Sequence, residues 1–358
     1  MKAKYKIFIA ALFTFSVYYS QDIHFSQLTE APLHLNPANS GLFDGYLRVN
    51  LNYRNQWAVM GQPFKTMAVS VDGVIGEKKD KQAYLGWGLS VFNDEAGASS
   101  YALNQATGFV NGIVNLDAKN KFCASVGGGY GQRSANFNTL TYGNQYNGTI
   151  FDQNIPSFEN NQFNQFGYAD VSAGLQWEYM KTEKGFDRDD NLDIKAGIAA
   201  WHLNQPRQKY TSNTEERLPM RLVGELTARV DLKGTRLAVL PAVVYMRQAS
   251  FKELNLGAFL RLRFKNPTKT TGFKHESGIS FGGFIRPGDA IIPQLLIDFN
   301  GFSVGFSYDY NVSSYKMSTM GNGGLEFSLQ WHSLRDALFK RVREFGKGGK
   351  NNTRITPK

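Results

Sequence analysis

The feature that most constrains this chain is a strong alternation of apolar and polar side chains that recurs along most of its length. In the first such segment the apolar face carries Leu47, Val49, Leu51 and Tyr53. Residues 166–180 and 302–311 repeat the pattern with aliphatic and aromatic side chains on one face. Alternation with a period of two predicts strands that have one apolar face, and it argues against amphipathic helices.

Fourteen segments of this kind can be counted, although 100–116 and 235–248 alternate poorly. We expect strands near 46–57, 64–73, 84–93, 100–116, 121–132, 166–180, 191–203, 218–232, 235–248, 253–264, 276–286, 291–300, 302–311 and 321–331. An even strand number, with each segment near the roughly 9 to 11 residues of a tilted spanning strand, is typical of bacterial outer-membrane barrels. The sequence therefore predicts an all-β fold, a transmembrane antiparallel up-and-down β-barrel of about 14 strands.

Composition supports this prediction. The mean hydropathy is −0.36, and after the first 20 residues no apolar run is long enough for a spanning helix. The many Gly, Phe and Tyr residues suit strands that are apolar on one face only. The net charge of +10 comes mainly from the two ends of the chain, and the nearly neutral body argues against a nucleic-acid partner.

The N-terminal part divides into two segments ahead of the barrel. Residues 1–20 carry Lys2, Lys4 and Lys6 before an apolar run and end at the small residue Ser20, which is the layout of a cleaved secretory signal peptide. Residues 21–45 precede the barrel, which we place at 46–331. We expect residues 21–45 to fold into the barrel as a plug, and their prolines argue against one continuous helix.

Residues 332–358 form a basic tail with eight Lys or Arg against two acidic residues. Leu334 and Leu338 are four residues apart, which predicts a short C-terminal amphipathic helix. An even number of strands returns the chain to the side where it began, so we expect the tail in the periplasm. There Lys340, Arg341 and Arg343 would allow docking to an acidic partner; a solvated tail without a partner is the alternative.

The connections between strands fit an outer-membrane orientation. With the N-terminus in the periplasm, odd-to-even connections face outward, and the longest of them is 133–165. Asn300 and Gly301 are a two-residue hairpin signal between the twelfth and thirteenth strands, which places a tight turn on the periplasmic side.

The last strand should turn its apolar side chains to lipid, namely Leu325, Phe327, Leu329 and Trp331. Its Glu326 then faces the lumen, and closure of the barrel brings it to the same wall as Arg48 or Arg54 of the first strand. We therefore predict a lumenal ion pair there. The other inward charges have both signs, and this mixture favours a lumen filled by paired charges over a selectivity ring.

No catalytic, cofactor or metal site is predicted. The histidines at 24, 34, 202, 275 and 332 have no spacing that suggests a nucleophile and its base. The weak metal candidate, with Asp187 as its first residue and Asp193 as its last, lacks the Gly and the Glu of a calcium loop and is better explained as a solvated periplasmic turn. The lone Cys123 is expected to be a packed small residue.

Short motifs stand at residues 21–27 and 35–41, at 53–57 and 63–66, and near the end of the chain at 308–311 and 324–327. Together they resemble the PorP/SprF family, a family of type IX secretion system outer-membrane proteins. The first two motifs are similar to the opening of that family, and the next two are similar to its first hairpin. The basic extension after Trp331 departs from the usual family pattern, which ends near the last strand.

The resemblance implies an outer-membrane accessory of type IX secretion and gliding motility, not an enzyme, that supports export or surface retention of a large adhesin. The implied partners are that substrate and components of the secretion or gliding machinery. The alternative function is a passive pore or hydrophobic-solute transporter. The residues of the family-like motifs are His24, Phe25, Asn36, Pro37, Gly41, Arg54 and Trp57. They either set turns and hold the N-terminal segment in place or contact a partner.

Overall fold

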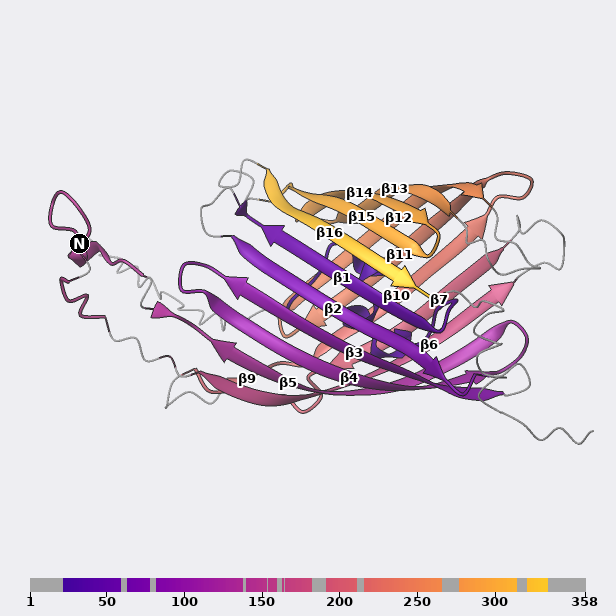
Figure 1. Cartoon of the computed structure of the whole chain (residues 1–358), viewed down its shortest axis with the longest axis horizontal. Coiled ribbons are helices and arrows are strands. Elements are labelled where there is room, and N and C mark those ends of the chain that lie inside the picture. The colour runs from indigo at the N-terminus through magenta and orange to yellow at the C-terminus, as the bar shows by residue number, and fades with distance from the viewer. Residues whose placement is uncertain are drawn as a thin grey trace, which may run out of the picture.

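A computed structural model of the chain shows a closed barrel of fourteen antiparallel strands (Figure 1). The structure describes residues 22–58, 63–77, 82–137, 140–152, 154–159, 163, 165–181, 191–210, 216–265, 277–313 and 321–333. Each strand pairs with the next along the chain, and the first pairs with the last. The predicted fold class is confirmed.

The strand bounds agree closely with those expected. The wall consists of β1 (Leu47–Gln56), β2 (Phe64–Ile75), β3 (Ala83–Ala96), β4 (Tyr101–Asn115), β5 (Asn120–Ser134), β6 (Phe166–Lys181), β7 (Leu192–Trp201), β10 (Arg221–Asp231), β11 (Leu237–Gln248), β12 (Phe251–Lys265), β13 (Ser277–Arg286), β14 (Ala290–Phe299), β15 (Phe302–Asn311) and β16 (Asn322–His332). A small two-stranded sheet of β8 (Arg207–Gln208) and β9 (Glu216–Arg217) lies in the connection after β7, and the sequence did not predict it.

The wall buries every second side chain, as the alternation requires. In β6, buried and more exposed residues follow one another along most of the strand. In β16, Leu325 is exposed and Glu326 is buried, so the predicted register is correct. Among the described residues, no helix is both long and apolar enough to cross a bilayer.

The two ends of the barrel differ in their connections. Asn300 and Gly301 both have positive φ, 49° and 84°, and close β14 and β15 by the predicted two-residue turn. We call the end with this turn the turn rim. The opposite end, the loop rim, carries the long connection between β5 and β6, with the short helix η5 (Gly143–Gln145) and a β-bridge between Tyr146 and Phe151.

The N-terminal segment, residues 22–46, lies inside the barrel (Figure 1). Three short helical turns interrupt it: η1 (Leu28–Glu30), α1 (Pro32–Leu35) and η2 (Pro37–Asn39). Proline starts both α1 and η2, where its missing N–H costs nothing but ends the preceding turn, so no continuous helix forms. The largest apolar cluster joins this segment to the wall through Leu28, Leu33 and Leu35.

Two strands carry a proline at a position where the ladder is broken. Between β10 and β11 the register runs continuously to Thr227↔Ala242 and resumes at Val230↔Val239, so the two residue pairs between them are missing. The ladder of β14 and β15 likewise lacks the pairs between Ile291↔Tyr310 and Gln294↔Ser307. These pairs are missing because Pro241 and Pro293 have no N–H to donate to the neighbouring strand.

Some expectations fall outside the described residues. These are the signal peptide at 1–20, Asp187 of the weak metal candidate, and the tail beyond Ser333 with its predicted helix and the residues Leu334, Leu338, Lys340, Arg341 and Arg343. The first residue of the predicted tail, His332, belongs to β16 instead. The other end of that candidate, Asp193, lies within β7 and lines a lumenal cavity, so it is not part of a solvated turn as expected.

Candidate functional site

The N-terminal segment runs through the lumen from the loop rim to the turn rim. Asp22 contacts residues at the loop-rim ends of the wall, and Ser26 contacts β15 and β16. Asn36 reaches β6 and β10, and Gly41 reaches β2. At the turn rim, the backbone N–H of Tyr46 donates to the Ser333 hydroxyl at 3.2 Å. One continuous segment therefore holds strands on opposite sides of the barrel together.

A buried ion cluster lies where the barrel closes. Arg54 of β1 is the direct cross-strand partner of Glu326 of β16, and their Nη1 and Oε2 atoms are 3.1 Å apart. The Nη2 atom of Arg54 lies 2.8 Å from Oδ2 of Asp309 in β15. All three side chains are at most 3 % exposed. The predicted lumenal pair is present for Arg54, and Asp309 is a second acceptor that the sequence did not indicate.

The same cluster holds the start of the N-terminal segment. The backbone N–H groups of Ser26 and Gln27 donate to the two oxygens of Glu326 at 2.7 and 3.0 Å. The Ser26 hydroxyl donates to Asp309 at 2.7 Å, and Arg54 donates to that hydroxyl. Glu326 therefore joins the first strand, the last strand and the N-terminal segment in one hydrogen-bonded network.

In the middle of the lumen, the buried Asn36 is a branching point. Its amide nitrogen lies within hydrogen-bond distance of Gln176 and Glu225, at 3.0 and 3.1 Å, and its Oδ1 accepts from the backbone N–H of Ala38. Asn39 also donates to Glu225, at 3.1 Å. Among the residues that the structure describes, no arginine pairs with Glu225, and the asparagines donate to this carboxylate instead. Their contacts position the N-terminal segment.

Nearer the turn rim, the segment passes close to β2 and β3 at Gly41. Its φ is +74°, and an added Cβ would lie 2.9 Å from both the Gly73 carbonyl oxygen and the Gly86 Cα atom, so glycine is required twice over. The Gly41 N–H donates to Asp72, which also forms an ion pair with Arg48 at 2.9 Å. Arg48 therefore pairs within its own hairpin, and Arg54 alone meets Glu326.

At the loop rim, the first described residue, Asp22, belongs to a cluster of four charged groups. His202 lies between two carboxylates, with Nδ1 2.8 Å from Asp170 and Nε2 3.0 Å from Asp22. Asp22 also pairs with Arg221 at 3.1 Å. Burial disfavours the imidazolium, but the carboxylates of Asp22 and Asp170 outweigh it and raise the pKa of His202 to about 9.

The other motif residues lie at different places in the structure. Phe25 packs edge-to-face on His34, with ring centroids 5.5 Å apart, inside a cluster near the loop rim. Pro37 begins η2. Trp57 lies outside the N-terminal segment. It follows β1 at the loop rim, where its backbone N–H donates to the Gly323 carbonyl oxygen and its ring packs edge-to-face on Phe64. His24 lies beside Phe25 and lines two small lumenal pockets.

Several other inward charges are paired across or along the wall. Glu178 meets both Lys121 and Lys195, and Asp231 meets both Arg229 and Arg263. A further pair joins Arg261 and Asp298. These contacts agree with the expectation of a lumen filled by paired charges.

Sequence reasoning missed Ser26, Asp72, Asp309 and His202 as members of these networks. Asp72 and Asp309 lie on the polar faces of alternating strands, so they could have been predicted to face the lumen. Which lumenal groups meet depends on where the N-terminal segment crosses, and a periodic pattern carries no such information.

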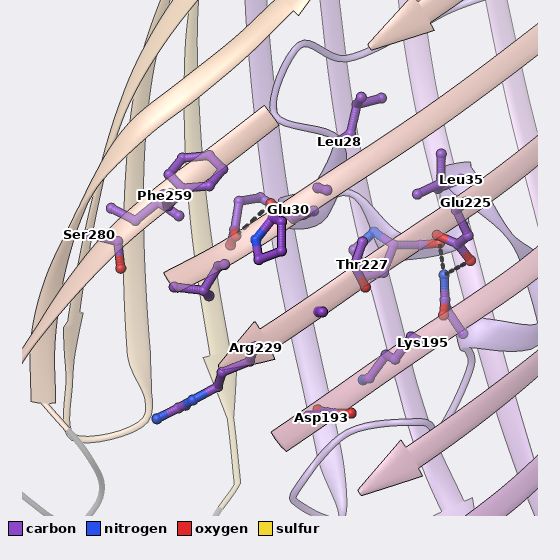
Figure 2. Close-up of a pocket in the computed structure, with 18 of the residues that line it drawn as sticks. Leu28, Glu30, Leu35, Asp193, Lys195, Glu225, Thr227, Arg229, Phe259 and Ser280 are labelled. Carbon is purple, nitrogen blue, oxygen red and sulfur yellow. Dashed lines mark hydrogen bonds between the residues drawn. The ribbon is translucent and has the colours of Figure 1, made fainter. Parts of the chain in front are cut away.

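A cavity of about 300 Å³ remains between the segment and one side of the wall (Figure 2). The N-terminal segment contributes Leu28, Glu30 and Leu35 to its lining. Figure 2 shows Glu225, Thr227 and Arg229 following one another along β10.

Comparison with known proteins identifies one family. The model of the family described as type IX secretion system membrane protein PorP/SprF matches residues 17–331. No curated protein matches the sequence. Among solved structures, the Ralstonia pickettii toluene transporter TbuX is 11 % identical with a TM-score of 0.46, covering 85 % of this chain and 94 % of its own. BamA from Haemophilus ducreyi lacking POTRA domains 1–3 is 11 % identical with a TM-score of 0.41, covering 80 % and 70 %. Similarity at this level says nothing about what this chain binds.

Proposed function

This chain belongs to the PorP/SprF family of type IX secretion system membrane proteins, and on that premise we propose that it supports export or surface retention of a large adhesin. In this role the barrel is an outer-membrane accessory of secretion and gliding motility. The loop rim faces outward and the turn rim faces the periplasm. The chemistry is recognition and support, with no catalytic step.

The observation that carries this proposal is the lumen that the N-terminal segment and its ion pairs occupy. A segment anchored by Glu326, Glu225 and Asp72 at successive depths is built as a fixed plug. A barrel filled in this way supports a contact surface better than it conducts solutes. Partners would then contact the two rims of the barrel, where the loops can vary in sequence.

The long connection at the loop rim has the character of a protein-binding surface. Between residues 140 and 159, Asp152 and Glu159 are the only charged side chains. Ile150, Phe151 and Phe158 are 61 %, 54 % and 88 % exposed. Exposed aromatic side chains among uncharged polar ones are typical of interface cores, from which charges are depleted. We propose that this loop contacts the adhesin.

A clean deletion tests the function. It should abolish surface display of one or a few type IX substrates while most secretion continues, as measured by proteomics of the shaved cell surface. The double change Ile150→Asn and Phe151→Asn should reproduce the defect with a normally inserted barrel. Leu232→Asn, a change of an exposed apolar residue near the turn rim, is the matched control and should have no effect. An unchanged surface proteome after deletion contradicts the proposal.

The basic tail is proposed to dock on an acidic component of the secretion or gliding apparatus in the periplasm. Truncation after Ser333, with charge reversal at Lys340, Arg341 and Arg343 as a second variant, should impair display or motility without loss of the barrel. Normal display in both variants excludes a docking role. The pore alternative predicts steady conductance in planar bilayers, whereas a fixed plug predicts silence.

A further inference from the structure

The outward face of the barrel wall carries few charged side chains. Among the side chains that the structure describes, the outward positions of the fourteen wall strands hold only five, namely Lys65, Glu95, Lys181, Arg247 and Lys252. Lys65 and Glu95 are direct cross-strand partners of opposite sign. Lys181 is the last residue of β6, at the turn rim. The other two charges are both positive and lie together.

Arg247 and Lys252 face each other across the hairpin of β11 and β12. They are direct cross-strand partners, one pair away from the two-residue turn at Ala249 and Ser250. The pair next to such a turn is hydrogen bonded, so the following pair is not, and its side chains lie closest. Both side chains are exposed, and neither has a hydrogen-bond or ion-pair partner among the described residues. The protein therefore supplies no counter-charge to these two cations.

The two cations lie at the outer edge of the apolar band. The outward residues of β11 are apolar from Leu237 to Tyr245. A strand of that length, tilted by about 40°, rises roughly 20 Å, close to the roughly 25 Å of an outer-membrane apolar band. Leu237 lies at the turn rim, so Arg247 comes level with the lipid headgroups at the loop rim. The next pair toward the turn rim, Tyr245 and Leu254, is apolar and exposed.

A matching anion has to come from outside the barrel. Like charges directly opposite each other destabilise a hairpin, and an anion between them removes the repulsion. The turn after β13 holds Asp289, but this carboxylate pairs with Arg286 at 2.8 Å. A phosphate group suits an arginine beside a lysine, because the guanidinium donates two parallel hydrogen bonds and the ammonium adds a compact charge.

We propose that Arg247 and Lys252 bind a phosphate group of lipid A, the phosphorylated glycolipid of the outer leaflet. The phosphate lies between the two cations, and an acyl chain of the same lipid lies along Tyr245 and Leu254. This inference rests on the proposed orientation, in which the loop rim faces outward. The ligand is a lipid and not a free ion, because apolar surface continues directly from the two cations.

The first experiment measures lipid A binding by native mass spectrometry of the purified full-length protein in detergent. A cation near an anionic headgroup contributes about fivefold in affinity, so Arg247→Gln combined with Lys252→Gln should bind roughly 25-fold more weakly than the wild type. Lys65→Gln is the matched control, because it removes an outward cation that faces Glu95, and it should bind as the wild type does. Dephosphorylated lipid A should bind the wild type as weakly as intact lipid A binds the double variant.

The second experiment uses a charge reversal that should leave the barrel folded. In Lys252→Glu the new carboxylate faces Arg247 and takes the place of the external anion. Without lipid, the urea midpoint of this variant should be at least as high as that of the wild type. Added lipid A should raise the midpoint of the wild type and leave that of the variant unchanged, because a ligand stabilises only the protein that binds it.

Two competitors distinguish the possible sources of the anion. Inorganic phosphate lacks an acyl chain, and phosphatidylglycerol carries a singly charged phosphodiester where lipid A carries a phosphomonoester with a second ionisation near neutral pH. We expect neither, added in excess, to displace bound lipid A. Displacement by inorganic phosphate would show a simple anion site, and displacement by phosphatidylglycerol would show a general anionic-lipid surface; either result overturns the assignment to lipid A.

The site itself is excluded by two further results. These are equal binding of lipid A by the wild type and the double glutamine variant, and equal binding of intact and dephosphorylated lipid A by the wild type. Both experiments use purified protein, whereas the role in export is tested by surface display after deletion. The failure of one proposal can therefore be distinguished from the failure of the other.

Discussion

Replacing Arg54 by Met tests how the barrel is closed. Met keeps much of the volume but removes the guanidinium, leaving Asp309 and Glu326 buried without it. In the native protein, Oδ2 of Asp309 and Oε2 of Glu326 lie 2.8 and 3.1 Å from the guanidinium nitrogens of Arg54. None of the three side chains is more than 3 % exposed. Removing one member of a buried ion pair costs about 3 to 5 kcal/mol, because a charge stays buried and uncompensated.

The remaining network reduces this cost only in part. Glu326 keeps its two backbone donors from the N-terminal segment, and Asp309 keeps the Ser26 hydroxyl. We therefore expect a loss of about 4 kcal/mol, which corresponds to roughly a thousandfold change in the folding equilibrium. The assay is urea unfolding of the protein in short-chain phospholipid vesicles.

A triple variant isolates the electrostatic part of the effect. Arg54→Met combined with Asp309→Asn and Glu326→Gln removes the stranded charges and should recover more than half of the lost stability. If Arg54→Met costs less than about 1 kcal/mol, the value of an exposed pair, the closing cluster is not the stabilising element described here. If the triple variant is as unstable as the single one, packing rather than charge is responsible.

Three further changes probe other parts of the molecule. Because the pKa of His202 is raised from 6.5 to about 9, its contribution to stability, on the order of 3 kcal/mol, is complete below pH 6.5 and is lost as the pH rises through 9. The hydrogen-exchange protection factors of residues 22–31, which correct for the intrinsic rise of amide exchange with pH, should therefore fall over that range in the wild type and stay constant in His202→Gln. Phe327→Arg should cost roughly 2 to 4 kcal/mol if the residue lies near mid-bilayer, against about 1 or less for Phe299→Arg at the turn rim, measured by the same urea assay. Gly41→Ala should lower the free energy of unfolding by at least about 1 kcal/mol more than Gly76→Ala does. Both glycines have a positive φ, but a Cβ at Gly76 would meet open space, so equal losses would show that the close approach at Gly41 is unimportant.

The strands of the wall could be predicted from the sequence more fully than the contacts inside the lumen. Alternation places Leu325 outward and Glu326 inward, and closure of an even-stranded barrel then brings Glu326 opposite Arg54, so this pair can be predicted. The contacts of Ser26 with Asp309 cannot, because they depend on the path of an irregular segment across the lumen. A segment without regular secondary structure has no periodic pattern from which its contacts could be predicted.

The weak alternation of residues 235–248 has a structural explanation. Proline is depleted in strands, so Pro241 weakens the strand pattern in which it lies. The strand nevertheless forms, because it pairs with β12 without a break, and Pro241 itself pairs with Ala258. The irregularity in the sequence coincides with the position where β11 cannot donate a backbone hydrogen bond to β10, and the register of the two strands is the same on both sides of it.

The contacts of Glu326 also determine the order in which the chain can fold. This carboxylate accepts from Ser26, 300 positions earlier, and pairs with Arg54, 272 positions earlier. Contacts this distant in sequence carry the full entropic cost of closing a long loop, so they form last. Docking of the N-terminal segment and sealing of the first strand to the last therefore share one late step, and a nascent chain lacking its final strand can complete neither.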